Sequence, residues 1–98
     1  MRYIRTLDGC LQVDVSDDSS WGDFERIARL IVKRFDGRVV AQSDDPDQRL
    51  WDIEIAGAVV RLHLEHRRSL SLFAADPGGD EAVRRVGQFL AQILPTKK

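Results

Sequence analysis

The 98-residue chain has a single cysteine, Cys10, and therefore cannot form an internal disulfide. A secreted scaffold held together by disulfides is excluded on this ground. The apolar runs are only a few residues long, much shorter than a bilayer-spanning helix requires. The N-terminal stretch "MRYIRTLDGC" also lacks the continuous apolar segment of a secretory signal. These absences predict a cytoplasmic protein with no membrane association.

An excess of charge of one sign is missing as well. The net charge is −1, from 15 Lys and Arg against 16 Asp and Glu. Residues 1–49 carry eight basic and ten acidic side chains, and residues 50–98 carry seven and six. Neither half has the basic excess of a nucleic-acid-binding domain. With 43% hydrophobic residues, the composition is that of a globular protein. We expect one domain over residues 1–98, with 95–98 as a frayed tail.

The motifs of common catalytic and metal sites are absent too. There is no GxSxG or HExxH sequence, and no phosphate-loop lysine follows the glycines of "DPGG". The two histidines, His63 and His66, are three residues apart, which in a strand places them on opposite faces. Zinc needs three or four convergent ligands, and Cys10 belongs to another part of the chain. The sequence therefore predicts no metal, no cofactor and no catalytic residues.

The first hairpin is indicated by alternation of apolar and polar residues. "RYIRT" and "LQVDV" flank Asp8-Gly9, and Asp-Gly is a strong signal for a two-residue hairpin turn. A turn at this position pairs Ile4 with Val13 on the buried face. Arg5 then lies on the opposite, polar face.

Two segments have the apolar spacing of amphipathic helices. "WGDFERIARLIVKRF" predicts a helix over residues 21–35, with Ser20 as its N-cap and Gly37 as its left-handed end. "DEAVRRVGQFLAQIL" predicts a second helix over residues 80–94. Because Gly87 lies on the apolar stripe of this helix, we expect a close approach to the sheet there.

A second hairpin is predicted within "RLWDIEIAGAVVRLHLE". A two-residue turn at Gly57-Ala58 pairs Glu54 with Arg61 and Asp52 with His63 on the polar face.

Two further strands complete the predicted sheet. One is "RVVAQS" at residues 38–43, and the other is "SLSLFAA" at 69–75. The latter strand must place Leu72 opposite Leu62 if the apolar faces are to coincide. This register requires an odd number of loop residues, most simply 66–68.

The element order ββαββββα predicts an α+β fold. We expect a single antiparallel or mixed sheet of five to six strands, with both helices packed on one face. The predicted core consists of Ile4, Leu11, Val13, Phe24, Ile27, Ile31, Trp51, Ile53, Ile55, Leu62, Leu64, Leu70, Leu72, Val86 and Leu90.

On the polar face, the expected registers place Asp52, His63 and Ser71 side by side. These are the residue types of a nucleophilic triad. A flat sheet, however, offers no oxyanion hole beside Ser71 and no pocket that excludes water. A solvated polar face is favoured, and a small hydrolase or metal-assisted enzyme at these residues is the least favoured alternative.

The same face is expected to interleave cations with aromatic rings, at Tyr3, Arg5, Arg61, His63 and Phe73. This is the predicted binding surface, because aromatic and arginine residues are enriched at the centres of protein interfaces. A platform for single-stranded nucleic acid is an alternative reading. Carboxylates among the arginines would repel phosphates, so nucleic acid is not the expected partner.

No motif identifies a family, and the leading hypothesis is a non-enzymatic protein-interaction module. Its partner would be another protein or a second copy of the chain. The expected architecture resembles small bacterial interaction domains, among them immunity proteins that neutralise toxins. That resemblance implies a second candidate surface, the acidic loop "DDPDQ", with Asp44, Asp45 and Asp47 directed at a basic partner.

Overall fold

The computed structural model describes residues 2–7, 9–16, 19–65, 69–75 and 77–94. Its element order, ββαββββα, confirms the predicted α+β fold. The elements are β1 (Arg2–Arg5), β2 (Leu11–Ser16), α1 (Trp21–Phe35), β3 (Arg38–Asp44), β4 (Arg49–Ile55), β5 (Ala58–Leu64), β6 (Leu70–Ala74), the 3₁₀ turn η1 (Pro77–Gly79) and α2 (Asp80–Ile93).

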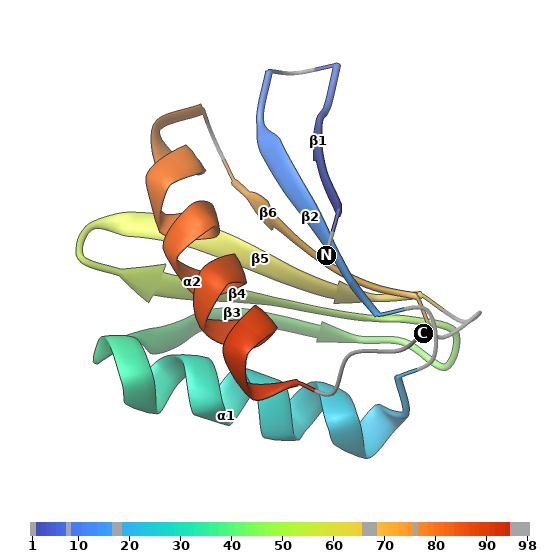
Figure 1. The fold of residues 1–98 in the computed structure, drawn as a ribbon. Coiled ribbons are helices and arrows are strands. Elements are labelled where there is room, and N and C mark those ends of the chain that lie inside the picture. Colours follow the sequence, from blue (N-terminus) through green and yellow to red (C-terminus); the bar gives the residue numbers. More distant parts are fainter. Residues whose placement is uncertain (1, 8, 17–18, 66–68, 76, 95–98) are drawn as a thin grey trace.

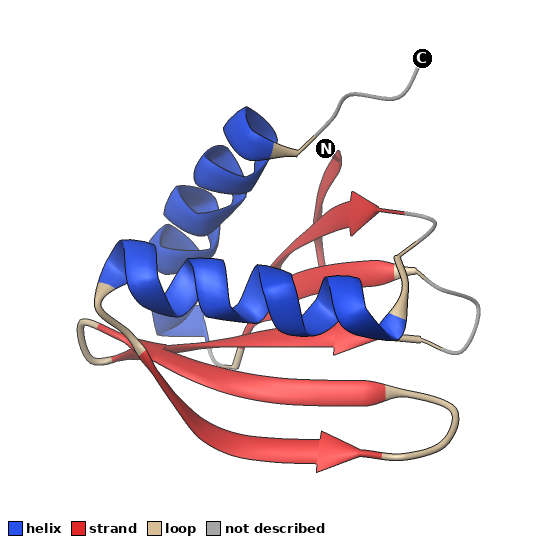
Figure 2. Ribbon diagram, turned by 90° about the horizontal axis from the view of Figure 1, so that it is seen from below, coloured by secondary structure: helices blue, strands red, loops and turns tan. Residues whose placement is uncertain are grey.

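Six strands form one antiparallel sheet in the order β1-β2-β6-β5-β4-β3. Alternate residues of β4, β5 and β6 are buried, and these side chains pack against both helices. Figure 1 shows the sheet twisting above α1 with α2 beside it, and Figure 2 shows α1 lying over the strands. No element among the described residues covers the opposite face, which we call the open face. None of the helices described is both long and apolar enough to cross a membrane.

The predicted core is confirmed at every position except Ile4. Ile4 is 37% exposed, and Trp21, the first residue of α1, is 44% exposed. The core also contains five small or medium side chains beyond the predicted set, namely Cys10, Ala28, Val60, Ala74 and Val83.

Helix α1 spans the predicted residues, Trp21–Phe35, but its left-handed end is one residue earlier than predicted. The Ser20 hydroxyl accepts a hydrogen bond from the backbone of Asp23, whose carboxylate accepts one from the backbone of Ser20. At the other end, Asp36 rather than Gly37 adopts the left-handed conformation, with φ 52°. Gly37 is needed for a different reason. A Cβ there would lie 2.8 Å from the backbone oxygen of Glu54, so β4 passes too close for any side chain.

The predicted register of the first hairpin is wrong by one residue. Tyr3 pairs with Val13, so Ile4 turns to the open face. The strands close through Thr6, whose N–H donates to the carbonyl of Cys10 at 2.8 Å, and Gly9 is left-handed with φ 82°. Asp-Gly also suits a longer loop that ends in a left-handed glycine, the conformation that Gly9 adopts. A one-residue slip exchanges the two faces of β1.

The predicted turn of the second hairpin is wrong as well, although its buried face is right. The turn residues are Ala56 and Gly57, with φ 50° and 86°, instead of Gly57-Ala58. Positive φ at both positions matches the twist of the flanking strands. Asp52 therefore pairs with Arg61, and the predicted Glu54–Arg61 and Asp52–His63 pairs do not form. A shift of two residues leaves the buried side chains unchanged.

The third hairpin has the predicted register. Leu62 pairs with Leu72, and Leu64 pairs with Leu70. The predicted loop at 66–68 lies outside the described residues. The strand expected at 38–43 is present as β3 and forms one edge of the sheet.

Candidate binding surface on the open face

The centre of the open face is an arginine held between an acid and an aromatic ring. Arg61 donates two hydrogen bonds to Asp52, from Nε at 2.6 Å and from Nη2 at 3.0 Å. Its Cζ lies 5.9 Å from the centroid of the Phe73 ring. The hydrogen bonds to Asp52 raise the pKa of Arg61. The guanidinium is thus fixed in position and its charge is already balanced.

His63 fills the neighbouring position on β5. Its ring meets Phe73 edge to face, with centroids 6.5 Å apart, and its Nε2 lies 2.8 Å from Oε1 of Gln48. Phe73 therefore contacts two side chains of β5, Arg61 and His63. The three side chains form a packed group that needs little reordering before it contacts a partner.

The triad-like row expected on this face does not form. His63 lies opposite Leu50 and Ser71, while Asp52 is engaged with Arg61. The contact of the His63 ring with Gln48 leaves it without the carboxylate that orients the base of a triad. Within the described ranges, no three His, Cys, Asp or Glu side chains are placed to hold a metal ion.

Two residues predicted on the open face, Tyr3 and Arg5, lie on the helix face instead. The slip in β1 turns both toward α2. Arg5 donates a hydrogen bond of 2.8 Å to Asp80, which also accepts the N–H of Leu11 at 3.0 Å. These hydrogen bonds lower the pKa of Asp80, and the one from Arg5 contributes most to the shift. The Tyr3 hydroxyl lies where a side chain at position 87 would extend from Gly87. Both residues attach the first hairpin to α2 and cannot join the predicted surface.

The position left by Tyr3 and Arg5 is occupied by Ile4, which sequence reasoning placed in the core. Paired residues form one row across the sheet, consisting of Ile4, Gln12, Phe73, Arg61, Asp52 and Ala41. We call this set the open-face row. Ile4 and Phe73 are its two large apolar members. Only the register could have identified Ile4, because its apolar character indicates burial.

The acidic loop provides less free charge than the sequence indicates. Asp44 ends β3, and its carboxylate accepts hydrogen bonds from Nε of Arg49 at 2.9 Å and Nε1 of Trp51 at 2.9 Å. These hydrogen bonds lower the pKa of Asp44, and the one from Arg49 contributes most to the shift. Asp45 and Asp47 are exposed, and the loop is closed by the N–H of Asp45 donating to the carbonyl of Gln48.

Arg49 is a buried cation that the sequence reasoning missed. It is 3% exposed, and besides Asp44 it binds Glu25 at 3.0 Å and the carbonyl of Trp21 at 3.1 Å. Its Cζ also lies 4.9–5.0 Å from three aromatic rings, those of Trp21, Phe24 and Trp51. The available signal was the alternation of "RLWDIEI", which puts Arg49 on the same face as Trp51. Its role is structural, since its donors bind within the fold.

Comparison with known proteins adds a family but no activity. Residues 1–95 match the family described as "Protein of unknown function (DUF3630)". No curated protein and no solved structure matches the chain. The protein belongs to the DUF3630 family.

Proposed function

We propose that this protein is a non-enzymatic protein-interaction module that binds its partner through the open face, centred on Phe73. The observation that carries the proposal is the open-face row. It sets an arginine-flanked aromatic ring in the middle of a six-stranded sheet whose face no described element covers. We also propose a cytoplasmic location, in keeping with the lone buried cysteine.

The open-face row has features that lower the free-energy cost of burying it in an interface. Arginine and aromatic residues are enriched at interface centres, where they fill desolvated contacts. Burying an unpaired charge would be costly, but Arg61 brings its counter-ion Asp52 with it. Ile4 adds an apolar contact 37% exposed in the free protein. A partner with an apolar patch and hydrogen-bonding groups fits this face.

Charge favours a protein over a nucleic acid as partner. Each arginine that the structure describes on the open face is matched by an acid from the next strand, in the pairs Arg2–Asp14 at 3.7 Å, Arg38–Glu54 at 2.9 Å and Arg61–Asp52 at 2.6 Å. A phosphate backbone gains its affinity from unpaired Lys and Arg. An immunity-type role through Asp45 and Asp47 is a weaker candidate, because Asp44 is engaged by Arg49.

The test compares variants of the same fold in a binding assay. The wild type, Phe73→Ala, Arg61→Glu and the control Ile93→Ala are used as baits, and their self-association is measured by sedimentation. Ile93 is 42% exposed and lies at the end of α2, so its variant removes apolar surface elsewhere. We expect the control to keep the interactions of the wild type and both open-face variants to lose them.

Two outcomes contradict the proposal. In one, folded Phe73→Ala and Arg61→Glu retain every partner and the self-association of the wild type. In the other, the wild type captures no protein and stays monomeric at millimolar concentration.

A further inference from the structure

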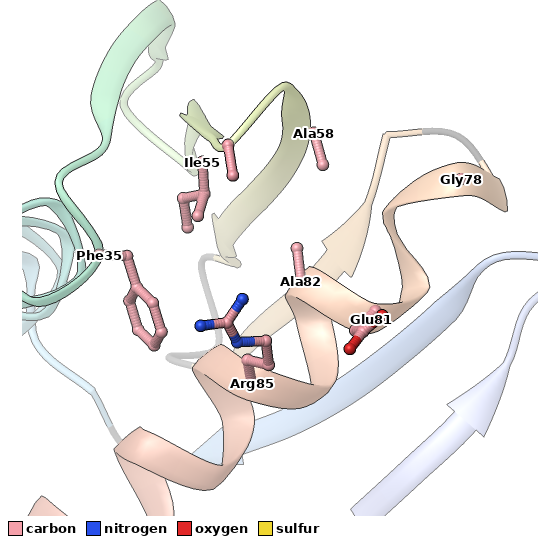
Figure 3. Close-up of a pocket in the computed structure, with 8 residues that line it drawn as sticks. Phe35, Ile55, Ala58, Gly78, Glu81, Ala82 and Arg85 are labelled. Atoms are coloured by element: carbon pink, nitrogen blue, oxygen red, sulfur yellow. The ribbon is translucent and has the colours of Figure 1, made fainter.

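A second surface feature lies away from the open face, where the end of α1, the β4–β5 turn and the start of α2 meet. It is a hollow of about 210 Å³. Figure 3 shows the side chains around it. They are Phe35, Ile55, Ala56, Ala58, Gly78, Glu81, Ala82 and Arg85. None of the open-face row takes part, so the hollow is independent of the proposed interaction surface.

The wall of the hollow combines apolar side chains with two charged groups, Arg85 and Glu81. Phe35, Ile55 and Ala82 supply the carbon surface. Figure 3 shows the Arg85 guanidinium pointing toward Phe35, and its Cζ lies 6.0 Å from the ring centroid. The Glu81 carboxylate lies on the other side of Ala82 from Phe35. Apolar side chains with a small number of polar groups are the usual composition of a small-ligand site.

Arg85 forms no ion pair with a carboxylate within the described ranges of the chain. The same is true of Arg34, whose Cζ lies 5.3 Å from the Phe35 centroid and 5.8 Å from that of Phe89. Seven other arginines each hold a carboxylate, namely Arg2, Arg5, Arg26, Arg29, Arg38, Arg49 and Arg61. Two guanidiniums therefore lie next to the Phe35 ring against one lining carboxylate, that of Glu81, which leaves a net positive charge at the hollow.

We propose that this hollow binds a small carboxylate carrying one aromatic ring. The ring lies against Phe35 and Ile55, and the carboxylate receives a forked hydrogen bond from Arg85. The flat guanidinium fork matches a carboxylate in this way. The volume is below the roughly 300–1,000 Å³ of sites for drug-sized ligands, which limits the occupant to one ring and a short acid arm. Glu81 at the rim disfavours a doubly charged anion.

The experiment is a titration of the ¹⁵N-labelled protein with phenylacetate, followed by amide chemical shifts. We expect saturable shifts at residues 35, 55–58 and 78–85, with little change on the open face. Phenylacetamide has the same ring without the charge, and we expect it to bind about tenfold more weakly, the effect of one charge-assisted hydrogen bond. Arg85→Gln should weaken phenylacetate binding by a similar factor. Arg84→Gln, one position along α2 and outside the hollow, should bind like the wild type.

A second variant tests the site without changing charge. Ala82→Leu keeps a good helix former at its position and fills the hollow, so phenylacetate binding should be lost while the spectrum stays that of a folded protein. The proposal is overturned if phenylacetate shifts no lining residue, if Arg85→Gln binds as tightly as the wild type, or if folded Ala82→Leu still binds.

Discussion

The buried cation Arg49 allows a sharp test of how the α1 side of the sheet is held together. Replacing it by methionine keeps an unbranched stem as far as the position of Nε and removes the guanidinium. The change deletes two hydrogen bonds to Asp44, one to Glu25 and one to the carbonyl of Trp21. It also deletes the contact of the cation with the surrounding aromatic rings.

The loss of stability in Arg49→Met depends on whether water can solvate Asp44 and Glu25 once the guanidinium is gone. Removing one member of a fully buried ion pair costs about 3–5 kcal/mol, because the other charge is left buried. Here the side chains of Asp44 and Glu25 are 39% and 41% exposed, so water can solvate them again. We therefore expect Arg49→Met to lower the free energy of unfolding by about 2–3 kcal/mol. Arg49→Lys keeps the charge but loses the fork, and should cost about 1–2 kcal/mol.

The pH dependence gives an independent signature. Because the pKa of Asp44 is lowered from 3.8 in the folded protein, its carboxylate stabilises the fold above that value. The stabilisation disappears as the pH falls through the lowered pKa. Arg49 is the main cause of the shift, so the stability difference between the wild type and Arg49→Met should shrink as the pH falls from 5 toward 2.

Urea denaturation followed by tryptophan fluorescence and circular dichroism measures both effects. Arg29→Met is the matched control, because Arg29 touches Glu25 only at 3.9 Å and its side chain is 80% exposed. We expect it to cost less than about 0.5 kcal/mol. If Arg49→Met unfolds like this control, or if its deficit is the same at pH 2 as at pH 7, the assigned role of Arg49 is wrong.

Three further predictions concern packing. Leu62→Ala should lose about 2–5 kcal/mol in a urea melt and Arg61→Ala much less, and equal losses would refute the assignment of the two sheet faces. Gly87→Ala should destabilise the protein by about 1–3 kcal/mol, because its methyl group meets the Tyr3 hydroxyl. Adding Tyr3→Phe should restore most of that loss, and a lack of rescue would show that the contact is not limiting. Gly37→Ala should lower the thermal midpoint by several degrees, since its Cβ would lie 2.8 Å from a backbone oxygen of β4; an unchanged midpoint would contradict that close approach.

The buried face of the central strands could be predicted because alternation tolerates error in the turns. The second hairpin was predicted two residues out of register, yet Ile53 and Leu62 stayed on the buried face. A register shift of two residues keeps each side chain on the same face of the sheet, whereas a shift of one residue moves it to the other face. Cross-strand partners have no such protection. The expected Asp52–His63 pair, and the triad-like row that depended on it, disappeared with the shift.

The first hairpin could not be predicted correctly from its own residues. Asp-Gly supports both a two-residue turn and a longer loop, and Tyr3 and Ile4 are each apolar enough to face the core. In the structure β1 is tied to α2, at the other end of the sequence, through the contact of Tyr3 with Gly87 and the ion pair of Arg5 with Asp80. The sequence shows Gly87 as a glycine on the apolar stripe of α2, but it does not show that Tyr3 occupies the space beside it.

The one-residue shift in the register of β1 determines which of its side chains the open face carries. With Tyr3 and Arg5 outward, the face would have carried a cation without an acid beside a second aromatic ring, as a nucleic-acid platform does. With Ile4 outward, the edge of the row is apolar instead. The charge at its centre is balanced by the Arg61–Asp52 pair. What a partner meets is then an isoleucine and a phenylalanine separated by hydrogen-bonding groups, a surface suited to the apolar centre and polar rim of a protein interface.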